Sequence, residues 1–156
     1  YLQKKSDEEI VDLFIPVLTE KNLNPDKVYV TGVCRLVKER VNFIRELWEQ
    51  SSFFFIAPES FDEKSVKEKW KDGSSQLLKE IQTVISSAQD FDPPLLKEFV
   101  SNHIHEKQYN MGQVMNALRI CIVGASKGPD LFEIISMIGK EETLKRIEFG
   151  MRTVNK

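Results

Sequence analysis

The feature that most constrains the fold is a pair of apolar helical segments joined by a short loop of small residues, within residues 117–148. The first segment ends at Gly124, and the loop that follows carries Lys127. Pro129 is placed to open the second segment and Gly139 to close it. Proline suits the first position of a helix and glycine the position after its last turn. The pattern predicts two helices connected by a tight loop.

Helical start signals and helical spacing of apolar residues recur along the rest of the chain. Ser6-Asp7-Glu8-Glu9 is a capping box, and Asp92-Pro93 opens another helix. Pro16 is expected to kink or restart the helix that the capping box begins. Two segments favour strand on propensity alone, Val28–Thr31 and Ile120–Val123. Both lie inside longer helical patterns, so they are interpreted as buried helix.

The expected fold class is all-α, with about eight helices in two packed subdomains. An apolar stripe over residues 33–48 predicts a long helix near the N-terminal end. A break at residues 89–94 interrupts two later helices and suggests the division. We therefore expect a first helical subdomain over residues 1–90 and a second over residues 91–156.

Charge is unevenly distributed in this chain of 156 residues, whose formal net charge is −2. The balance excludes a uniformly basic nucleic-acid binder. Residues 21–45, however, hold six basic and two acidic residues, and residues 110–156 hold seven and five. Each basic segment is either a binding face or an ordinary solvated face. No apolar run approaches the roughly 20 residues of a membrane helix.

The residues that carry enzyme chemistry do not form any familiar motif. A nucleophile elbow, a Walker loop and a dinucleotide-binding glycine motif are all missing from the sequence. His103 and His105 would face different sides of a helix, so they are expected to be solvated or capping residues and not metal ligands. The two cysteines, Cys34 and Cys121, are expected to be buried thiols. No catalytic residue and no metal ligand is predicted.

The loop over residues 124–129 has two interpretations. It is rich in glycine, carries a lysine and precedes a helix, which is a setting that holds phosphate in other proteins. The alternative is a tight turn between two helices.

The order of the "LR…G" helix, this loop, "GPDLFEI" and "IGKEETLKRIE" resembles the C-terminal end of bacterial glutamyl-tRNA synthetases, where the corresponding segment binds the tRNA anticodon. The resemblance implies that Gly128, Pro129 and Leu131 pack on anticodon bases. It also implies that Arg119 reaches the first anticodon base and that Lys127 meets phosphate. The alternatives are a surface ion pair for Arg119, the first helical position for Pro129 and core packing for Leu131.

A second segment, Leu36–Leu47, resembles a helix pair in the first anticodon-binding subdomain of the same family. Arg40 falls where glutamate-specific members place an arginine that reads the third anticodon base. Glutamate and glutamine anticodons differ at that base, which is C in one and G in the other. The alternative for Arg40 is a surface salt bridge with Glu39 or Glu46.

The resemblance implies that the chain is the anticodon-binding region of a cytoplasmic glutamyl-tRNA synthetase, and the start at Tyr1 without methionine fits a longer parent. That parent joins glutamate to tRNA with ATP and Mg²⁺ in an upstream catalytic domain. The segment itself is expected to be monomeric, to bind a glutamate-accepting tRNA, and to need no cofactor, metal or membrane. One rival is a helical protein-interaction module with an exposed groove at Phe53–Phe55. A stand-alone helical enzyme is the other, which the missing motifs disfavour.

Overall fold

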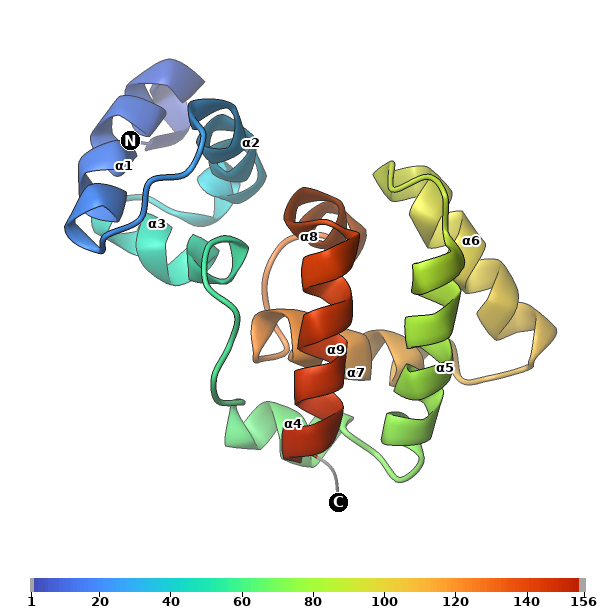
Figure 1. Ribbon diagram of the computed structural model, residues 1–156. Helices are drawn as coiled ribbons and strands as arrows, with labels where there is room; N and C mark the ends of the chain where they lie inside the picture. Colours follow the sequence, from blue (N-terminus) through green and yellow to red (C-terminus); the bar gives the residue numbers. More distant parts are fainter. Residues whose placement is uncertain (1, 155–156) are drawn as a thin grey trace. The chain divides into compact units, whose positions relative to one another are not determined.

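The computed structural model describes residues 2–154, and all regular structure in that range is helical, as Figure 1 shows. The expected all-α class is confirmed. The chain divides into two compact units, one ending at Ile56 and one beginning at Ala57. The boundary between subdomains was expected near residue 90. That position lies inside the second unit, at the turn between two helices that pack together. The Asp-Pro signal there starts a helix and does not separate subdomains.

Within residues 2–56, the first unit has three α-helices and three short 3₁₀ helices. Apolar residues of α1 and α2 face each other and form most of its core, and α3 packs on both of them. The elements are η1 (Leu2–Lys4), α1 (Asp7–Glu20), α2 (Lys27–Val37), η2 (Lys38–Arg40), α3 (Ile44–Ser51) and η3 (Ser52–Phe54).

Helix α1 begins with the predicted capping box. The Ser6 hydroxyl accepts a hydrogen bond from the Glu9 amide at 3.2 Å, and the Glu9 carboxylate accepts one from the Ser6 amide at 2.9 Å. The helix then continues through Pro16 to Glu20, so the expected restart at the proline does not occur. Burial of Ile10 and Phe14 before it and Leu18 after it holds both halves of α1 against the same core.

The stripe that predicted one long helix over residues 33–48 is divided between two helices. Helix α2 ends at Val37, η2 follows, and the backbone is extended at Val41 and Phe43 before α3 begins. Val41 and Leu47 are both fully buried, which explains why the apolar pattern survives the break. Arg40 therefore ends a 3₁₀ turn and does not lie within a long helix.

The phenylalanine run at the end of the first unit belongs to its core. Phe53 and Phe54 are buried. The ring of Phe55 contacts the rings of Phe14 and Tyr29 edge-on and stacks on Trp48. Phe53 and Phe54 are thus core residues and do not supply the exposed groove that the protein-interaction rival needs.

In the second unit, α7 is the most deeply buried of the helices that the structure describes. Seven of its thirteen residues are buried, and it contacts α4, α5, α6 and α9. Figure 1 shows α9 lying beside α5 and across α7. The elements are α4 (Glu63–Lys69), α5 (Ser74–Ser87), α6 (Pro93–Glu106), α7 (Met111–Val123), α8 (Leu131–Ile138) and α9 (Lys140–Val154).

Helix α9 meets the C-terminal half of α7 at very close range. A Cβ atom added at Gly150 would overlap the Sγ atom of Cys121 and lie 3.2 Å from its Cβ. One turn earlier, the buried Arg146 donates a hydrogen bond to the Ile122 carbonyl at 2.8 Å and pairs with Glu142. The arginine satisfies a carbonyl at the end of α7 that has no partner within the helix.

The two cysteines are free and buried, as expected, and burial raises the pKa of each thiol to about 12. Segments 28–31 and 120–123 are helical, as expected. Ile120–Val123 is buried throughout, whereas in 28–31 Val30 is buried and Val28 is 77% exposed. Across residues 2–154, the helices are all too short or too polar to cross a membrane.

The contact at Gly150 generates a stability prediction. Gly150→Ala should lower the free energy of unfolding by about 1–3 kcal/mol, because a methyl group added to a closely packed interface forces α9 away from α7. Chemical denaturation measures the effect. In a Cys121→Ala background the same substitution should cost clearly less, since the overlapping sulfur is gone. An equal cost in both backgrounds would contradict the close approach.

Candidate nucleic-acid interface

The loop between α7 and α8 is held by an arginine from α7. One terminal nitrogen of Arg119, Nη1, donates to the carbonyls of Lys127 at 2.9 Å and Pro129 at 2.8 Å. A guanidinium is planar and presents several donors at once, so it suits two carbonyls of one turn. A surface ion pair was the alternative for Arg119; in the structure the guanidinium bonds to the loop itself. Arg119 orders the segment that carries Lys127 and Gly128.

The start of α4 braces the other side of this loop. The Gly124 carbonyl accepts a hydrogen bond from the Asp62 amide at 2.8 Å, and the Ser126 amide donates to the Ser65 hydroxyl at 2.9 Å. The Ser65 hydroxyl in turn donates to the Asp62 carboxylate. Hydrogen bonds from the Ser65 side chain and backbone hold the pKa of Asp62 below its usual value. The positive charge of Lys127 contributes to the same shift.

The start of α8 is already capped by the chain's own carboxylate. Asp130 accepts hydrogen bonds from the amides of Phe132 and Glu133, each at 3.1 Å. These are the amides that would bind a phosphate at a helix start, and Asp130 adds a negative charge beside them. The geometry therefore favours the tight-turn interpretation of the loop over a phosphate cradle.

The residues of the loop differ in how much of each is accessible. Lys127 is exposed and Gly128 half-buried, whereas Pro129 and Leu131 are buried. Gly128 has a φ of 106°, which L side chains rarely adopt, so glycine is required for this turn. Leu131 is 5% exposed and lies at the start of α8, which packs on α6 and α9. The base contacts suggested for Pro129 and Leu131 stay predictions, and packing is the role their burial supports.

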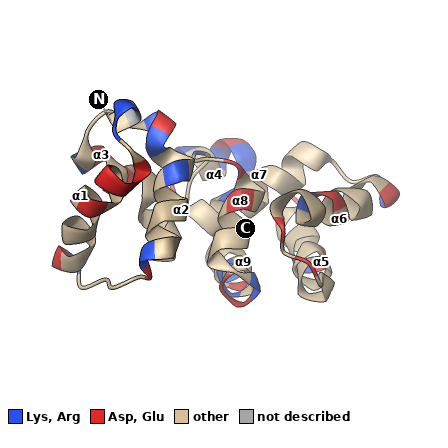
Figure 2. Cartoon of the chain, turned by 90° about the horizontal axis from the view of Figure 1, so that it is seen from above, with Lys and Arg blue, Asp and Glu red and all other residues tan. Residues whose placement is uncertain are grey.

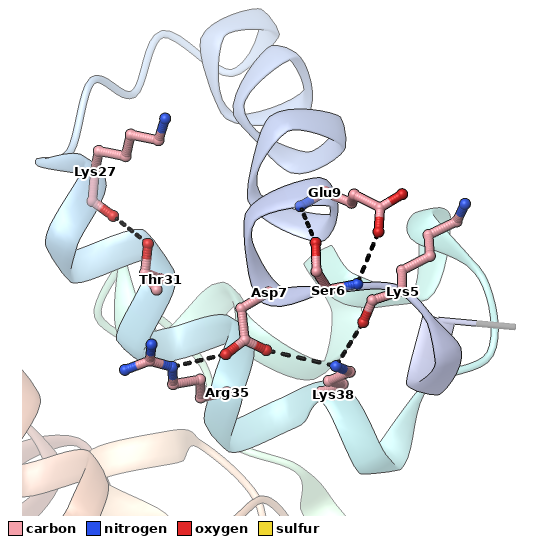
Figure 3. A network of polar contacts seen from close by, with 8 residues as sticks. All are labelled: Lys5, Ser6, Asp7, Glu9, Lys27, Thr31, Arg35 and Lys38. Atoms are coloured by element: carbon pink, nitrogen blue, oxygen red, sulfur yellow. Dashed lines mark hydrogen bonds and ion pairs between the residues drawn. The ribbon is translucent and has the colours of Figure 1, made fainter.

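In the first unit, the segment that carries Arg40 is anchored by a network around Asp7. The Asp7 carboxylate accepts from Arg35 at 2.8 Å and from Lys38 at 3.5 Å, as Figure 3 shows. Lys38 also donates to the Lys5 carbonyl at 2.7 Å. These contacts join η2 to the start of α1. The Arg35 hydrogen bond is the largest cause of a lowered Asp7 pKa.

Arg40, which follows this anchor, is exposed. Its suggested partner Glu46 is otherwise engaged, since one oxygen accepts hydrogen bonds from the Asn42 and Phe43 amides at 2.9 Å each. Within the described part of the chain, no ion pair includes Arg40. The salt-bridge alternative with Glu39 or Glu46 is thus not realised, and the guanidinium projects from a fixed turn.

The predicted site residues fall into two groups. Five of them, Arg119, Lys127, Gly128, Pro129 and Leu131, meet at one loop of the second unit, while Arg40 lies in the first. Figure 2 shows lysine and arginine interspersed with acidic residues in both units. The brace from Asp62 and Ser65 was not predicted from sequence. No local pattern signals a contact between residues about sixty positions apart.

The histidines contribute no metal site. His103, expected to be solvated or capping, is half-buried, and its Nε2 lies 2.9 Å from the Glu80 carboxylate, joining α6 to α5. Hydrogen bonds from His103 and then Tyr109 lower the pKa of Glu80. His105 is exposed. Between residues 2 and 154, no three potential ligands among histidine, cysteine and acidic side chains cluster closely enough to hold a metal ion.

Comparison with known protein families gives a match over nearly the whole chain. The model of the anticodon binding domain matches residues 9–151. The matched range includes η2 with Arg40 and the loop between α7 and α8, so both groups of predicted site residues lie within it.

Relatives of known name are all much longer than this chain. The glutamate–tRNA ligases of Bacteroides fragilis and Christiangramia forsetii are each 44% identical to it, over 95% and 99% of the chain. The chain covers 29% and 30% of those two proteins. A crystal structure of a glutamate tRNA ligase from Elizabethkingia meningosepticum is similar with a TM-score of 0.93 and 39% identity. That match covers 99% of this chain and 31% of the ligase. The chain therefore spans less than a third of these relatives.

The two loop hydrogen bonds of Arg119 generate a prediction. Arg119→Met keeps the aliphatic stem but removes both bonds, so the free energy of unfolding should fall by about 1.5–3 kcal/mol. Amide hydrogen exchange in residues 124–130 should accelerate more than in α5. Arg152→Met is the matched control, since Arg152 is exposed, pairs weakly with Glu148 at 3.8 Å and lies 5.9 Å from the centroid of the Phe149 ring. Equal exchange in both variants would exclude the ordering role.

Proposed function

Because the chain belongs to the anticodon binding domain family, we propose that it recognises the anticodon loop of a tRNA as the C-terminal part of a glutamate–tRNA ligase. The match over residues 9–151 carries this proposal, and the names of the relatives supply the amino acid. Two structural features support it independently. They are an exposed arginine on an anchored turn in the first unit and a lysine-bearing ordered loop in the second.

Arg40 is the residue proposed to distinguish glutamate from glutamine anticodons. Arg40 is exposed, ends the 3₁₀ turn η2, and lies in a segment with a basic excess. A planar donor group can bond the acceptor edge of cytosine and disfavour the larger guanine. Unpaired bases of RNA loops are commonly read in this way, through edges that are free of Watson–Crick partners.

The loop of the second unit is proposed to meet the other end of the anticodon. Lys127 would contact a phosphate, and the missing side chain of Gly128 would let a base approach the backbone. Arg119 would reach the first anticodon base while it holds the loop through Lys127 and Pro129. Pro129 and Leu131, proposed to pack on bases, are buried, so their stronger contribution would be to keep α8 and the loop in position.

The rest of the reaction is assigned to the parent protein. The whole ligase would join glutamate to tRNA in the cytoplasm, with ATP and Mg²⁺ bound by a catalytic domain upstream of this chain. The present segment would act as a monomeric recognition module. It offers no phosphate cradle of its own at α8, since Asp130 occupies the amides there.

Titration of this chain with tRNA tests the proposal directly. Glutamate-accepting tRNA should bind more tightly than glutamine-accepting tRNA. The affinity should fall as the salt concentration rises, because lysine and arginine contacts to phosphates release bound counterions. The same preparation should catalyse no glutamate-dependent exchange between ATP and pyrophosphate. If both tRNAs bound no better than an unrelated hairpin, the proposed function would be wrong.

Arg40 generates a separate prediction in the whole ligase. Arg40→Gln should reduce the preference for glutamate tRNA over glutamine tRNA by about 1–3 kcal/mol, judged from the energies of comparable base contacts. Charging efficiency measured on both tRNAs gives the ratio. Arg152→Gln, an exposed arginine on α9, is the control and should leave the ratio unchanged. An unaltered ratio in Arg40→Gln would remove the assignment.

A further inference from the structure

A phenylalanine is displayed on the surface three residues after Arg40. The side chain of Phe43 is 48% exposed, although it lies between the fully buried Val41 and Leu47. It is also the residue that precedes α3, with extended backbone. Single exposed apolar residues are common on protein surfaces and need no functional explanation. The surroundings of this ring are what set it apart.

The backbone that carries the Phe43 ring is held by hydrogen bonds and by its buried neighbours. The Phe43 amide donates to the Glu46 carboxylate at 2.9 Å, and the Asn42 amide donates to the same oxygen. The buried side chains of Val41 and Leu47 hold the chain on either side. The exposed ring is therefore attached to an ordered backbone, and a ligand that binds it pays little for ordering the protein.

An arginine accompanies the ring. The guanidinium carbon of Arg45 lies 5.0 Å from the centroid of the Phe43 ring, within the range of a cation–π contact. The ring and the guanidinium together present two flat groups and a positive charge on the surface. Arg40 is exposed in the preceding turn. Residues 40–45 therefore carry two arginines and no acidic residue. The carboxylate of Glu46, which follows them, is engaged by backbone amides.

We infer that Phe43 and Arg45 form a stacking site for an unpaired nucleobase of the RNA, next to the base that Arg40 reads. The inference rests on the proposed function and extends it to a second base. Aromatic rings and guanidinium planes are the surfaces on which single-stranded bases stack, and every base has a π face to offer. The positive charge favours a polyanion over an apolar protein partner, whose docking would leave Arg45 without a counter-charge.

The test compares three versions of the full chain in titrations with glutamate-accepting tRNA. Phe43→Leu keeps apolar bulk but removes the flat ring, and it should weaken binding about fivefold to a hundredfold, the range for loss of one base–aromatic stack. Phe43→Tyr keeps the ring and should bind like the wild type. Phe99→Leu is the matched control, because Phe99 is 44% exposed on α6 in the other unit. It should also bind like the wild type.

A spectroscopic measurement separates stacking from a general loss of affinity. A tRNA with 2-aminopurine in place of the base that adjoins the third anticodon base should lose fluorescence on binding the wild type, because stacking quenches this base. At saturating Phe43→Leu the quenching should be reduced, and with Phe43→Tyr it should remain. Circular dichroism of each variant verifies the fold.

The outcomes distinguish the two proposals. If wild-type chain binds the tRNA while Phe43→Leu binds and quenches equally, the stacking site is overturned and the proposed function stands. If the wild type does not bind the tRNA, the proposed function fails, and the stacking site fails with it. Weaker binding and reduced quenching by Phe43→Leu, with Phe99→Leu unchanged, would support the inference.

Discussion

The second unit depends on how the C-terminal end of α7 is held. A helix end leaves carbonyls without partners, and burying them costs free energy unless other groups donate to them. Here Arg146 from α9 satisfies the Ile122 carbonyl, and Gly150 lets α9 approach closely enough for that bond to form. The Asp62 amide satisfies the Gly124 carbonyl just beyond the helix. With the end of α7 fixed in this way, Arg119 projects from a rigid helix to the loop that follows.

In the first unit, acidic side chains order the backbone of a segment that carries exposed positive charge. Asp7 forms ion pairs with Arg35 and Lys38, which tie the end of α2 and η2 to the start of α1. Arg40 stands immediately after the anchored Lys38 and is exposed. Glu46 plays the corresponding part for the next turn by accepting the Asn42 and Phe43 amides. Asp7 and Glu46 thus hold the backbone of this region in place, while Arg40 and Arg45 are exposed.

Much of the local structure follows from the sequence, because it is set by neighbours along the chain. The capping box at Ser6, the helix start at Asp92-Pro93 and the helix end at Gly124 appear where the residues predict them. Burial explains two of the misplaced expectations. An apolar stripe records burial and not continuity, so it did not reveal the extended backbone at Val41 and Phe43. Pro16 likewise failed to restart α1, since core packing on both sides outweighs the lost hydrogen bond.

The sequence by itself determined the all-α class, the loop between α7 and α8, and the identity of Arg40, Arg119 and Lys127 as the cations to examine. The helices and the loop follow from spacing and capping, which are readable along one dimension, whereas the resemblance to a known family pointed to the three cations. Only the tertiary structure decided that Arg119 bonds to the Lys127 and Pro129 carbonyls, that Leu131 is buried, and that the Phe43 ring is exposed. Burial and long-range partners arise from which faces meet after the helices pack, and no local pattern of residues encodes that choice.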